Sequence, residues 1–218
     1  QLDQLAVVGG HELLEEFWPE TRGPSKRNLY VATTELRRVL RPNPQAKEID
    51  YIVRERGALF LNLQLPVWHD ASDCELAAEK AAAAEKQGDQ EGSLTHYRKV
   101  ATLCTGPYLE GCYQEWAVRR RSSWDERALR AYTALAQHAL AHKQPQQALD
   151  FSTRALEVDP GSQQGHLCKL RSHLQLRQPE AVIRHFEATE KLLRKEYELE
   201  PTIEMVEVYT RARHGMFD

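Results

Sequence analysis

The segment "YTALAQHALAHKQPQQALDFSTRALEVDP", from Tyr132 to Pro160, contains two helix-forming stretches around one short break. Gln144 and Pro145 form the break, because proline cannot continue a helix but fits well in the first turn of a new one. Alanine and other small residues recur along both stretches, which lets two antiparallel helices approach closely. The segment therefore predicts a helical hairpin that ends at Pro160.

The order of residue types in this hairpin matches the tetratricopeptide pattern, which repeats about every 34 residues. In that pattern an aromatic side chain fills the layer between repeats, and small residues allow the two helices to pack. Ser152 is the clear departure, with Phe151 beside it. A coincidental helical hairpin is the alternative. Counting back from the final proline, the pattern positions are Tyr132, Leu135, Ala136, Ala139, Ala148, Ser152, Ala155 and Pro160.

A second unit follows, because "KQPQQAL" at residues 143–149 is similar in sequence to "RQPEAV" at residues 177–182. The shared phrase predicts that two alanines of the second unit take the packing positions of two alanines in the first. These expected pairs are Ala148 with Ala181 and Ala155 with Ala188.

A weaker unit precedes both, with Ser93, Tyr97 and Val100 expected in its second helix. Three units are about the minimum that buries a continuous core. The last segment, "PTIEMVEVYTRARH", predicts a closing helix with Thr202 near its N-terminus.

The N-terminal part has a different organisation. "HELLEEFWPE" predicts a short amphipathic helix that Pro19 ends, and "SKRNLYVATTELRRVLRP" (Ser25–Pro42) predicts a second helix. At about 100° per residue, one face of the second helix is apolar and expected to be buried, and the other is basic and polar. The expected buried face is Leu29, Ala32, Leu36, Val39 and Leu40; the opposite face is Arg27, Tyr30, Val31, Thr34, Arg38 and Arg41.

Two strands are expected next, in "IDYIVRERGALFLNLQL", around a turn at Arg54–Gly57. Helix, basic helix and hairpin in this order are typical of a winged helix-turn-helix, whose second helix enters the major groove while the hairpin touches the DNA backbone. A surface helix with solvated arginines is the alternative interpretation. The predicted DNA-binding residues are Arg27, Tyr30, Thr34, Arg38, Arg41, Arg54 and Arg56.

Charge is distributed unevenly along the 218 residues. The net charge is −3, but residues 20–56 hold nine Lys or Arg against five Asp or Glu, so the basic residues gather early. We expect a mainly α protein of two modules, a partial winged helix-turn-helix with a small β-hairpin over residues 1–66 and a tetratricopeptide-like helical repeat domain over residues 67–218.

Other sites are less well supported by the sequence. Arg119, Arg120 and Arg121 could receive an anionic ligand, but consecutive helical residues point about 100° apart, so a solvated face with Trp116 and Trp124 in the core is favoured. His138 and His142 have the spacing of two metal ligands on one helix, yet no further ligand lies nearby in the sequence, so no metal is expected. The four cysteines, without a CxxC pair, are expected to be reduced: Cys74, Cys104, Cys112 and Cys168.

Several classes of protein are disfavoured. We find no phosphate-cradling Gly-rich loop, no HExxH and no nucleophile elbow, so neither an enzyme nor a cofactor is expected. No apolar run approaches the roughly 20 residues that a membrane span needs, and no signal peptide is visible. The sequence predicts a cytoplasmic protein.

Taken in order, "HELLEEFWPE", "NLYVATTELRRVLRP", "GPYLEGCYQEW", "ALEVDPGSQQGHLCKLRSHL" and "AVIRHFEATEKLLRKEYELEPTIEM" resemble the bacterial transcriptional activator domain of SARP-type regulators, from about Leu13 to Arg213. The resemblance implies an OmpR-type winged helix, a helical repeat domain, and a regulator that binds promoter DNA and assists RNA polymerase. It also implies binding in pairs, and hence a homodimer.

One departure from the family is visible. Its members carry a full helix ahead of the segment matching "HELLEEFW", where this chain has only "QLDQLAVVGG". We therefore expect Leu13, Phe17 and Leu36 to be partly uncovered, through truncation or because a partner covers them. Two other functions stay open: a scaffold whose repeats grip a protein without DNA binding, and an effector domain for a small anionic ligand such as a nucleotide second messenger.

Overall fold

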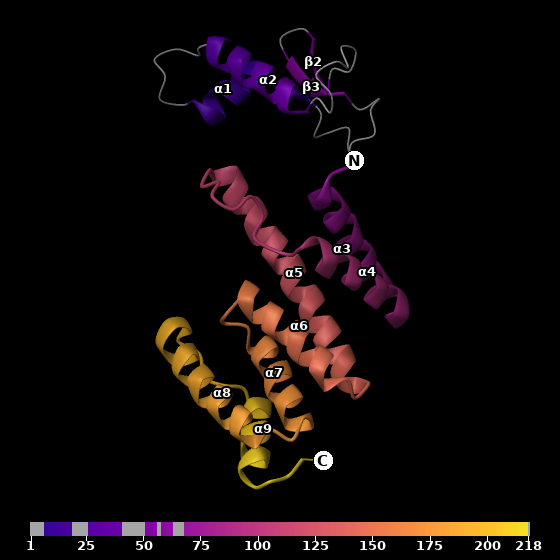
Figure 1. Ribbon diagram of the computed structural model, residues 1–218, viewed down its shortest axis with the longest axis vertical. Helices are drawn as coiled ribbons and strands as arrows, with labels where there is room; N and C mark the ends of the chain where they lie inside the picture. The colour runs from indigo at the N-terminus through magenta and orange to yellow at the C-terminus, as the bar shows by residue number, and fades with distance from the viewer. Residues whose placement is uncertain (1–6, 19–25, 41–50, 56–57, 63–67, 218) are drawn as a thin grey trace. The chain divides into compact units, whose positions relative to one another are not determined.

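The computed structural model describes residues 7–18, 26–40, 51–55, 58–62 and 68–217. It divides into two compact units, Gln1–Trp68 and His69–Asp218 (Figure 1). Each unit has its own secondary structure, mixed in the first and helical in the second.

The N-terminal unit contains two helices and a small antiparallel sheet. Its elements are β1 (Val7–Gly9), α1 (Gly10–Phe17), α2 (Lys26–Leu40), β2 (Ile52–Glu55) and β3 (Ala58–Leu61). The sheet order is β1-β3-β2, with Val53 opposite Phe60 in the hairpin. The hairpin and both helices confirm the expected partial winged helix-turn-helix. Strand β1 was not expected, because three residues are too few to show the alternation of apolar and polar residues that indicates a strand.

The expected buried face of α2 is only partly covered. Leu29 is 9% exposed, but Val39 is 72% and Leu40 40% exposed, so the prediction that these two residues lie on a buried face was wrong. Helix α1 has eight residues and α2 has fifteen, so α1, at about 1.5 Å per residue, is roughly 10 Å too short to cover α2. Phe17, at 41%, and Leu36, at 48%, are partly uncovered as expected.

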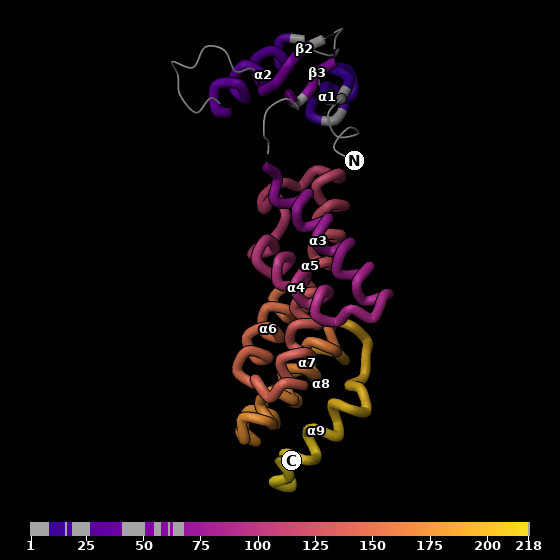
Figure 2. Tube along the Cα trace, turned by 90° about the vertical axis from the view of Figure 1, so that its right-hand side faces the viewer, coloured from indigo at the N-terminus to yellow at the C-terminus, as the bar shows by residue number. Residues whose placement is uncertain are grey.

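The second unit consists of consecutive helical hairpins, as Figures 1 and 2 show. Consecutive helices pack on each other along the unit, and a π-helical turn precedes the last helix. The elements are α3 (Asp70–Lys86), α4 (Gln90–Leu103), α5 (Glu115–Ala141), α6 (Pro145–Val158), α7 (Gln163–Gln175), α8 (Pro179–Leu192), the π-helix η2 (Leu193–Tyr197) and α9 (Ile203–Arg213).

The tetratricopeptide positions of α5 and α6 are buried, which confirms the pattern. Tyr132 is 3% exposed, and its hydroxyl donates to the Cys104 carbonyl oxygen at 2.8 Å. Ser152, the departure from the pattern, is fully buried and donates to the Leu149 carbonyl oxygen at 3.0 Å, so its hydroxyl is satisfied in the core. Thr202 caps α9 as expected, because its side chain accepts from the Met205 amide.

The expected alanine matches in the next unit were wrong. Ala188 is exposed, whereas the buried positions of α8 are Val182, Phe186 and Thr189. These three follow Ala148, Ser152 and Ala155 by 34 residues, the separation that also relates the two helix-starting prolines. Larger side chains thus occupy the equivalent buried positions of the second unit. Matching alanine with alanine had shifted the expected alignment of the two units by one residue.

Three hairpin turns share one backbone geometry. In each, the second residue after the first helix has a positive φ: 76° at Gly88, 55° at Lys143 and 56° at Arg177. The amide of that residue and the next amide both donate back into the last helical turn, as in a Schellman motif. For the turn at Lys143 these bonds reach the carbonyl oxygens of Leu140, at 3.1 Å, and Ala139, at 2.8 Å.

This shared turn predicts a gain in stability on replacing Lys143 by glycine. A side chain at positive φ costs about 1–2 kcal/mol, and glycine's greater freedom in the unfolded chain offsets part of that. We expect Lys143→Gly to raise the free energy of unfolding by about 0.5 kcal/mol and Gly88→Ala to lower it by about 1 kcal/mol. Chemical denaturation measures both.

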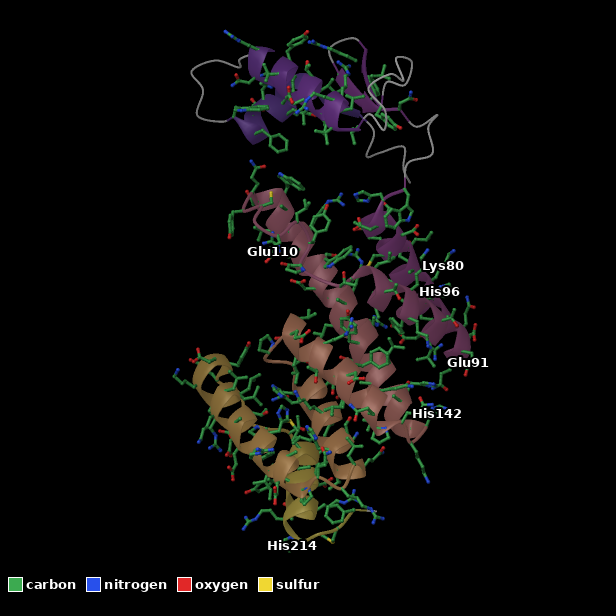
Figure 3. All side chains as sticks on the ribbon, in the orientation of Figure 1. Lys80, Glu91, His96, Glu110, His142 and His214 are labelled. Atoms are coloured by element: carbon green, nitrogen blue, oxygen red, sulfur yellow. The ribbon has the colours of Figure 1, made fainter. Side chains whose placement is uncertain are left out.

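The control is Lys80→Gly in the middle of α3, labelled in Figure 3, which should destabilise by about 1 kcal/mol. Equal effects of glycine at residues 80 and 143 would contradict the role of the turn.

Extra sequence separates the first turn from the second. Gly88 and Lys143 are 55 residues apart, against 34 between Lys143 and Arg177. The additional 21 residues include the loop after α4 and the N-terminal part of α5, which reaches 27 residues. The arginines at 119–121 lie in this additional part.

Candidate nucleic-acid interface

The predicted basic face of α2 is exposed. Its tyrosine, Tyr30, is 62% exposed, and Arg54 is exposed on β2 of the hairpin. Predicted residues Arg41 and Arg56 lie outside the described residues. The remaining predicted residues on α2 are exposed as well: Arg27, Thr34 and Arg38.

Thr34 is held against the helix by its own hydroxyl, which donates to the Tyr30 carbonyl oxygen at 2.7 Å. The oxygen of that hydroxyl keeps its acceptor capacity. Thr33, one residue earlier, donates to the Leu29 carbonyl oxygen at 2.8 Å. The exposed face therefore offers guanidinium and phenol donors beside a hydroxyl in a fixed orientation.

Arg38 is paired with an acidic residue, Glu35, which was not predicted from the sequence. Its Nε lies 2.9 Å and its Nη2 2.8 Å from Oε2 of Glu35, one helical turn away. Both side chains are exposed, at 74% and 57%, and such pairs contribute about 0–1 kcal/mol, so a stronger anion could displace Glu35 at little cost. The i, i+3 spacing was the available signal.

Arg37 has a structural position. Its Nε and Nη2 donate to the Ile52 carbonyl oxygen at 3.0 and 2.7 Å, which ties α2 to strand β2. Nothing in the local pattern indicated this contact, because its partner is fifteen residues away. Arg37 therefore fixes the hairpin relative to the basic face.

The arginine run on α5 is not brought together in one place. Arg119 pairs with Glu115 one turn earlier. Arg121 donates instead to the carbonyl oxygens of Tyr108, Leu109 and Cys112, at 2.8–2.9 Å, and so holds the loop that also carries Glu110 (Figure 3). Arg120 is half-buried. Because the three arginines have different surroundings, they do not form one binding site for an anionic ligand.

The two tryptophans beside this run differ. Trp124 is 6% exposed, as expected of a core residue, and its Nε1 donates to the Gly106 carbonyl oxygen at 2.9 Å. Trp116 is half-buried, with Nε1 donating to Oε1 of Gln114 at 2.8 Å.

A groove of about 830 Å³ lies between the end of α4, α5 and α6. Trp124 and Tyr132 line it, and the Arg154 guanidinium lies 6.0 Å from the centre of the Tyr132 ring. Three acidic side chains line it as well, and burial raises the pKa of one of them, Asp125, against the opposing effect of Arg121. The acidic groups are Asp125, Asp150 and Glu157.

The rings of His138, on α5, and His142, which caps the end of that helix, are tilted by 36° with their centres 4.0 Å apart; His142 is labelled in Figure 3. Burial, and the proximity of His142, lower the pKa of His138. In the described part of the chain, no group of three or more His, Cys, Asp or Glu is placed to hold a metal ion. Over those same residues, no helix combines the length and hydropathy needed to cross a membrane.

Solved structures with related folds were found. The chain is similar to Mycobacterium tuberculosis EmbR in complex with a low affinity phosphopeptide, with a TM-score of 0.64 and 16% identity over 95% of this chain. This match covers 55% of EmbR, so the chain spans about half of that protein's length. It is also similar to the C-terminal tetratricopeptide-repeat domain of a Plasmodium falciparum FK506-binding protein, with a TM-score of 0.52 and 10% identity over 67% of this chain and 92% of that one. At these identities the likeness shows the fold.

A comparison with curated proteins gave no match. The bacterial transcriptional activator domain matches residues 69–213, which is most of the chain and all of the helical hairpins. This chain therefore belongs to the family of bacterial transcriptional activator domains.

Proposed function

We propose that the N-terminal unit binds double-stranded promoter DNA, with α2 in the major groove and the β2–β3 hairpin on the backbone. The observation that carries this proposal is the exposed face of Arg27, Tyr30 and Arg38 on a helix that Arg37 ties to the hairpin. Arginine recognises guanine and phosphate, and a fixed hairpin with an exposed Arg54 adds a backbone contact. Thr34, Arg41 and Arg56 complete the proposed set.

Removal of Arg38 tests the interface. We expect Arg38→Ala to weaken binding to duplex DNA roughly tenfold, because one charge-assisted contact is lost. The slope of log affinity against log salt should fall by about 0.9, since one neutralised phosphate contributes about that much. Fluorescence anisotropy against a labelled random duplex, at several salt concentrations, measures both quantities.

The matched control is Lys80→Ala, which removes one exposed positive charge from the repeat unit. It should leave the slope unchanged. An Arg38→Ala protein with the wild-type slope would remove Arg38 from the proposed interface.

Neutralising Glu35 should have the opposite effect. Its carboxylate holds Arg38 and would also repel phosphate, so we expect Glu35→Gln to strengthen binding severalfold at low salt, with a smaller gain at high salt. The same titration measures this change. Equal affinity of Glu35→Gln and wild type would show that the Glu35 carboxylate does not compete with DNA for Arg38.

The groove of the repeat unit favours a second function, contact with a protein partner. Three acidic side chains line it against one arginine, so it suits a basic peptide segment with an apolar side chain for the Trp124 and Tyr132 surface. Membership of the family makes RNA polymerase the partner to propose, with a homodimer on DNA as the arrangement.

Labelled model peptides test the groove. A peptide of alternating lysine and leucine should bind more tightly than one of glutamate and leucine, and Asp150→Asn should reduce that preference severalfold. Glu91→Gln on α4, outside the groove lining, is the control. Equal binding of both peptides would contradict this second function.

A further inference from the structure

Two cysteines that are 30 residues apart in the sequence meet inside the first hairpin of the repeat unit. The Sγ atoms of Cys74, on α3, and Cys104, which caps the end of α4, are 2.8 Å apart. Cys74 is fully buried and Cys104 is 3% exposed. A disulfide bond of about 2.05 Å would require the sulfur atoms to approach by less than about 1 Å.

Backbone contacts fix the position of Cys104. Its amide donates to the Val100 carbonyl oxygen at 2.8 Å, and its own carbonyl oxygen accepts from the Tyr132 hydroxyl at 2.8 Å. Cys74 lies in the interior of a seventeen-residue helix. Both Cα atoms are therefore held by packed helices, and the proximity of the two sulfur atoms is built into the fold.

The surroundings separate the roles of the two thiols. A hydrogen bond from Cys104 lowers the pKa of Cys74, and the Arg127 guanidinium acts in the same direction against burial. The same hydrogen bond, together with burial, raises the pKa of Cys104. Cys74 is thus the better nucleophile, and Cys104 is the thiol that would resolve an oxidised Cys74.

The remaining cysteines have no such partner among the described residues. Cys168 is buried, its nearest polar contact being Nε2 of Gln164 at 3.9 Å, and burial raises its pKa. Cys112 is half-buried in the loop held by Arg121. Cys112 and Cys168 can therefore serve as comparison thiols within the same protein.

We propose that Cys74 and Cys104 are a redox-active pair that a small hydroperoxide oxidises to an intramolecular disulfide. Cys104 lines the groove and Cys74 is fully buried, so the proposal requires hydrogen peroxide to enter from the groove and pass Cys104 to reach the Cys74 sulfur. The sequence indicated four separate reduced thiols, since it contains no paired spacing; the contact arises from the packing of α3 on α4.

The reaction has two steps. The Cys74 thiolate attacks one peroxide oxygen, an S–O bond forms, the O–O bond breaks, and the departing hydroxide takes a proton and leaves as water. The sulfur of Cys104 then attacks the Cys74 sulfur, an S–S bond forms, and the S–O bond breaks to release a second water. The thiols lose two electrons, the peroxide gains them, and both thiol protons end in water.

The disulfide would join α3 to the end of α4 beside the groove that Trp124 lines. Closing a loop of this length should raise the Tm of the repeat unit by roughly 5–10 °C, because the unfolded chain loses freedom. Trp124 fluorescence should fall as the neighbouring thiol pair is oxidised.

Intact mass spectrometry of the native chain, treated with hydrogen peroxide and then blocked with a maleimide after unfolding, tests the proposal. We expect two maleimide adducts on the oxidised chain against four on the reduced one, a Cys74–Cys104 peptide after digestion, and reversal by dithiothreitol. The double variant C112S/C168S, which keeps only the pair, should form the same disulfide and so take up no maleimide when oxidised and two when reduced. A disulfide that forms in this variant only under denaturing conditions, or one that joins other cysteines in the wild type, would overturn the proposal.

A second measurement, dimedone labelling of the C104S variant, distinguishes a redox-active pair from two unreactive thiols that are merely packed together. C104S removes the resolving thiol, so peroxide should leave Cys74 as a sulfenic acid that a dimedone probe labels, at least fivefold above the wild type. If C104S does not fold, the C112S/C168S protein alone decides the question. Equal dimedone labelling of C104S and wild type would contradict the resolving role of Cys104.

Discussion

Replacing Tyr132 by alanine should destabilise the repeat unit by about 4 kcal/mol. The ring is 3% exposed and fills the layer between α4, α5 and α6, while its hydroxyl holds the Cys104 carbonyl oxygen. Truncation leaves a cavity and an acceptor without its donor. Because domains are stable by about 5–15 kcal/mol, this single change removes a large part of the total. Urea denaturation followed by circular dichroism measures it.

Two variants separate the contributions of Tyr132. Tyr132→Phe keeps the ring and should cost about 1 kcal/mol, the net value of one hydrogen bond. Tyr113→Ala removes a tyrosine that is 85% exposed and should change stability by less than about 0.5 kcal/mol. If Tyr132→Ala costs no more than Tyr132→Phe, the ring does not fill the layer between the repeats.

Acid should weaken the repeat unit through two neighbouring histidines, His166, which is buried, and His185, which is half-buried. His166 Nε2 lies 2.9 Å from the Pro160 carbonyl oxygen and therefore carries a hydrogen, and its Nδ1 faces Nε2 of His185 at 3.1 Å and Oγ1 of Thr189 at 3.1 Å. Burial, and then the neighbouring His166, lower the pKa of His185 to about 3. Burial also lowers the pKa of His166.

The direction of the pH effect follows from these shifts. Below the unfolded value of about 6.5, the unfolded chain binds more protons at His185 than the folded chain, so stability is full above that pH and falls as the pH drops toward 3. Between pH 7 and pH 4.5 we expect a loss on the order of 2 kcal/mol from His185. Urea titrations at both pH values measure it.

The control for acid lability is His185→Gln, which keeps a donor facing His166 but cannot be charged. Carboxylates titrate equally in both proteins, so the variant should lose less stability than the wild type over the same interval. Identical losses would show that the pKa of His185 is the same in the folded and unfolded states. Lys169 adds to the effect in the wild type, because its charge also lowers the pKa of both histidines.

The sequence predicted those features that depend on neighbouring residues. Helical period, the break at Gln144–Pro145 and the aromatic at Tyr132 established the repeat, because each acts through contacts within one hairpin. The match of Ala181 with Ala148 failed for a physical reason. A buried position requires an apolar side chain that fits the space between the helices, and either alanine or valine can meet that requirement. The residue buried at this position in the second unit is Val182.

Contacts between distant segments could not be read from the sequence. Arg37 was indistinguishable from the solvated arginines beside it, since the carbonyl oxygen of Ile52 that it reaches belongs to another element. The incomplete cover of Val39 had a similar cause, because it depends on the length of α1. Exposure of Arg27 and Tyr30 followed from helical geometry alone, whereas their proposed contact with DNA stays a prediction.

The long helix α5 has a consequence for how the repeat unit opens. It is continuous for 27 residues, about 40 Å, and packs on α3 and α4 as well as on α6 and α7. In an array of short repeats, an end can fray while the next unit stays intact, but here a single run of backbone hydrogen bonds crosses the boundary. Amide hydrogen exchange should therefore give the first two hairpins a common opening free energy, so that they behave as one cooperative block.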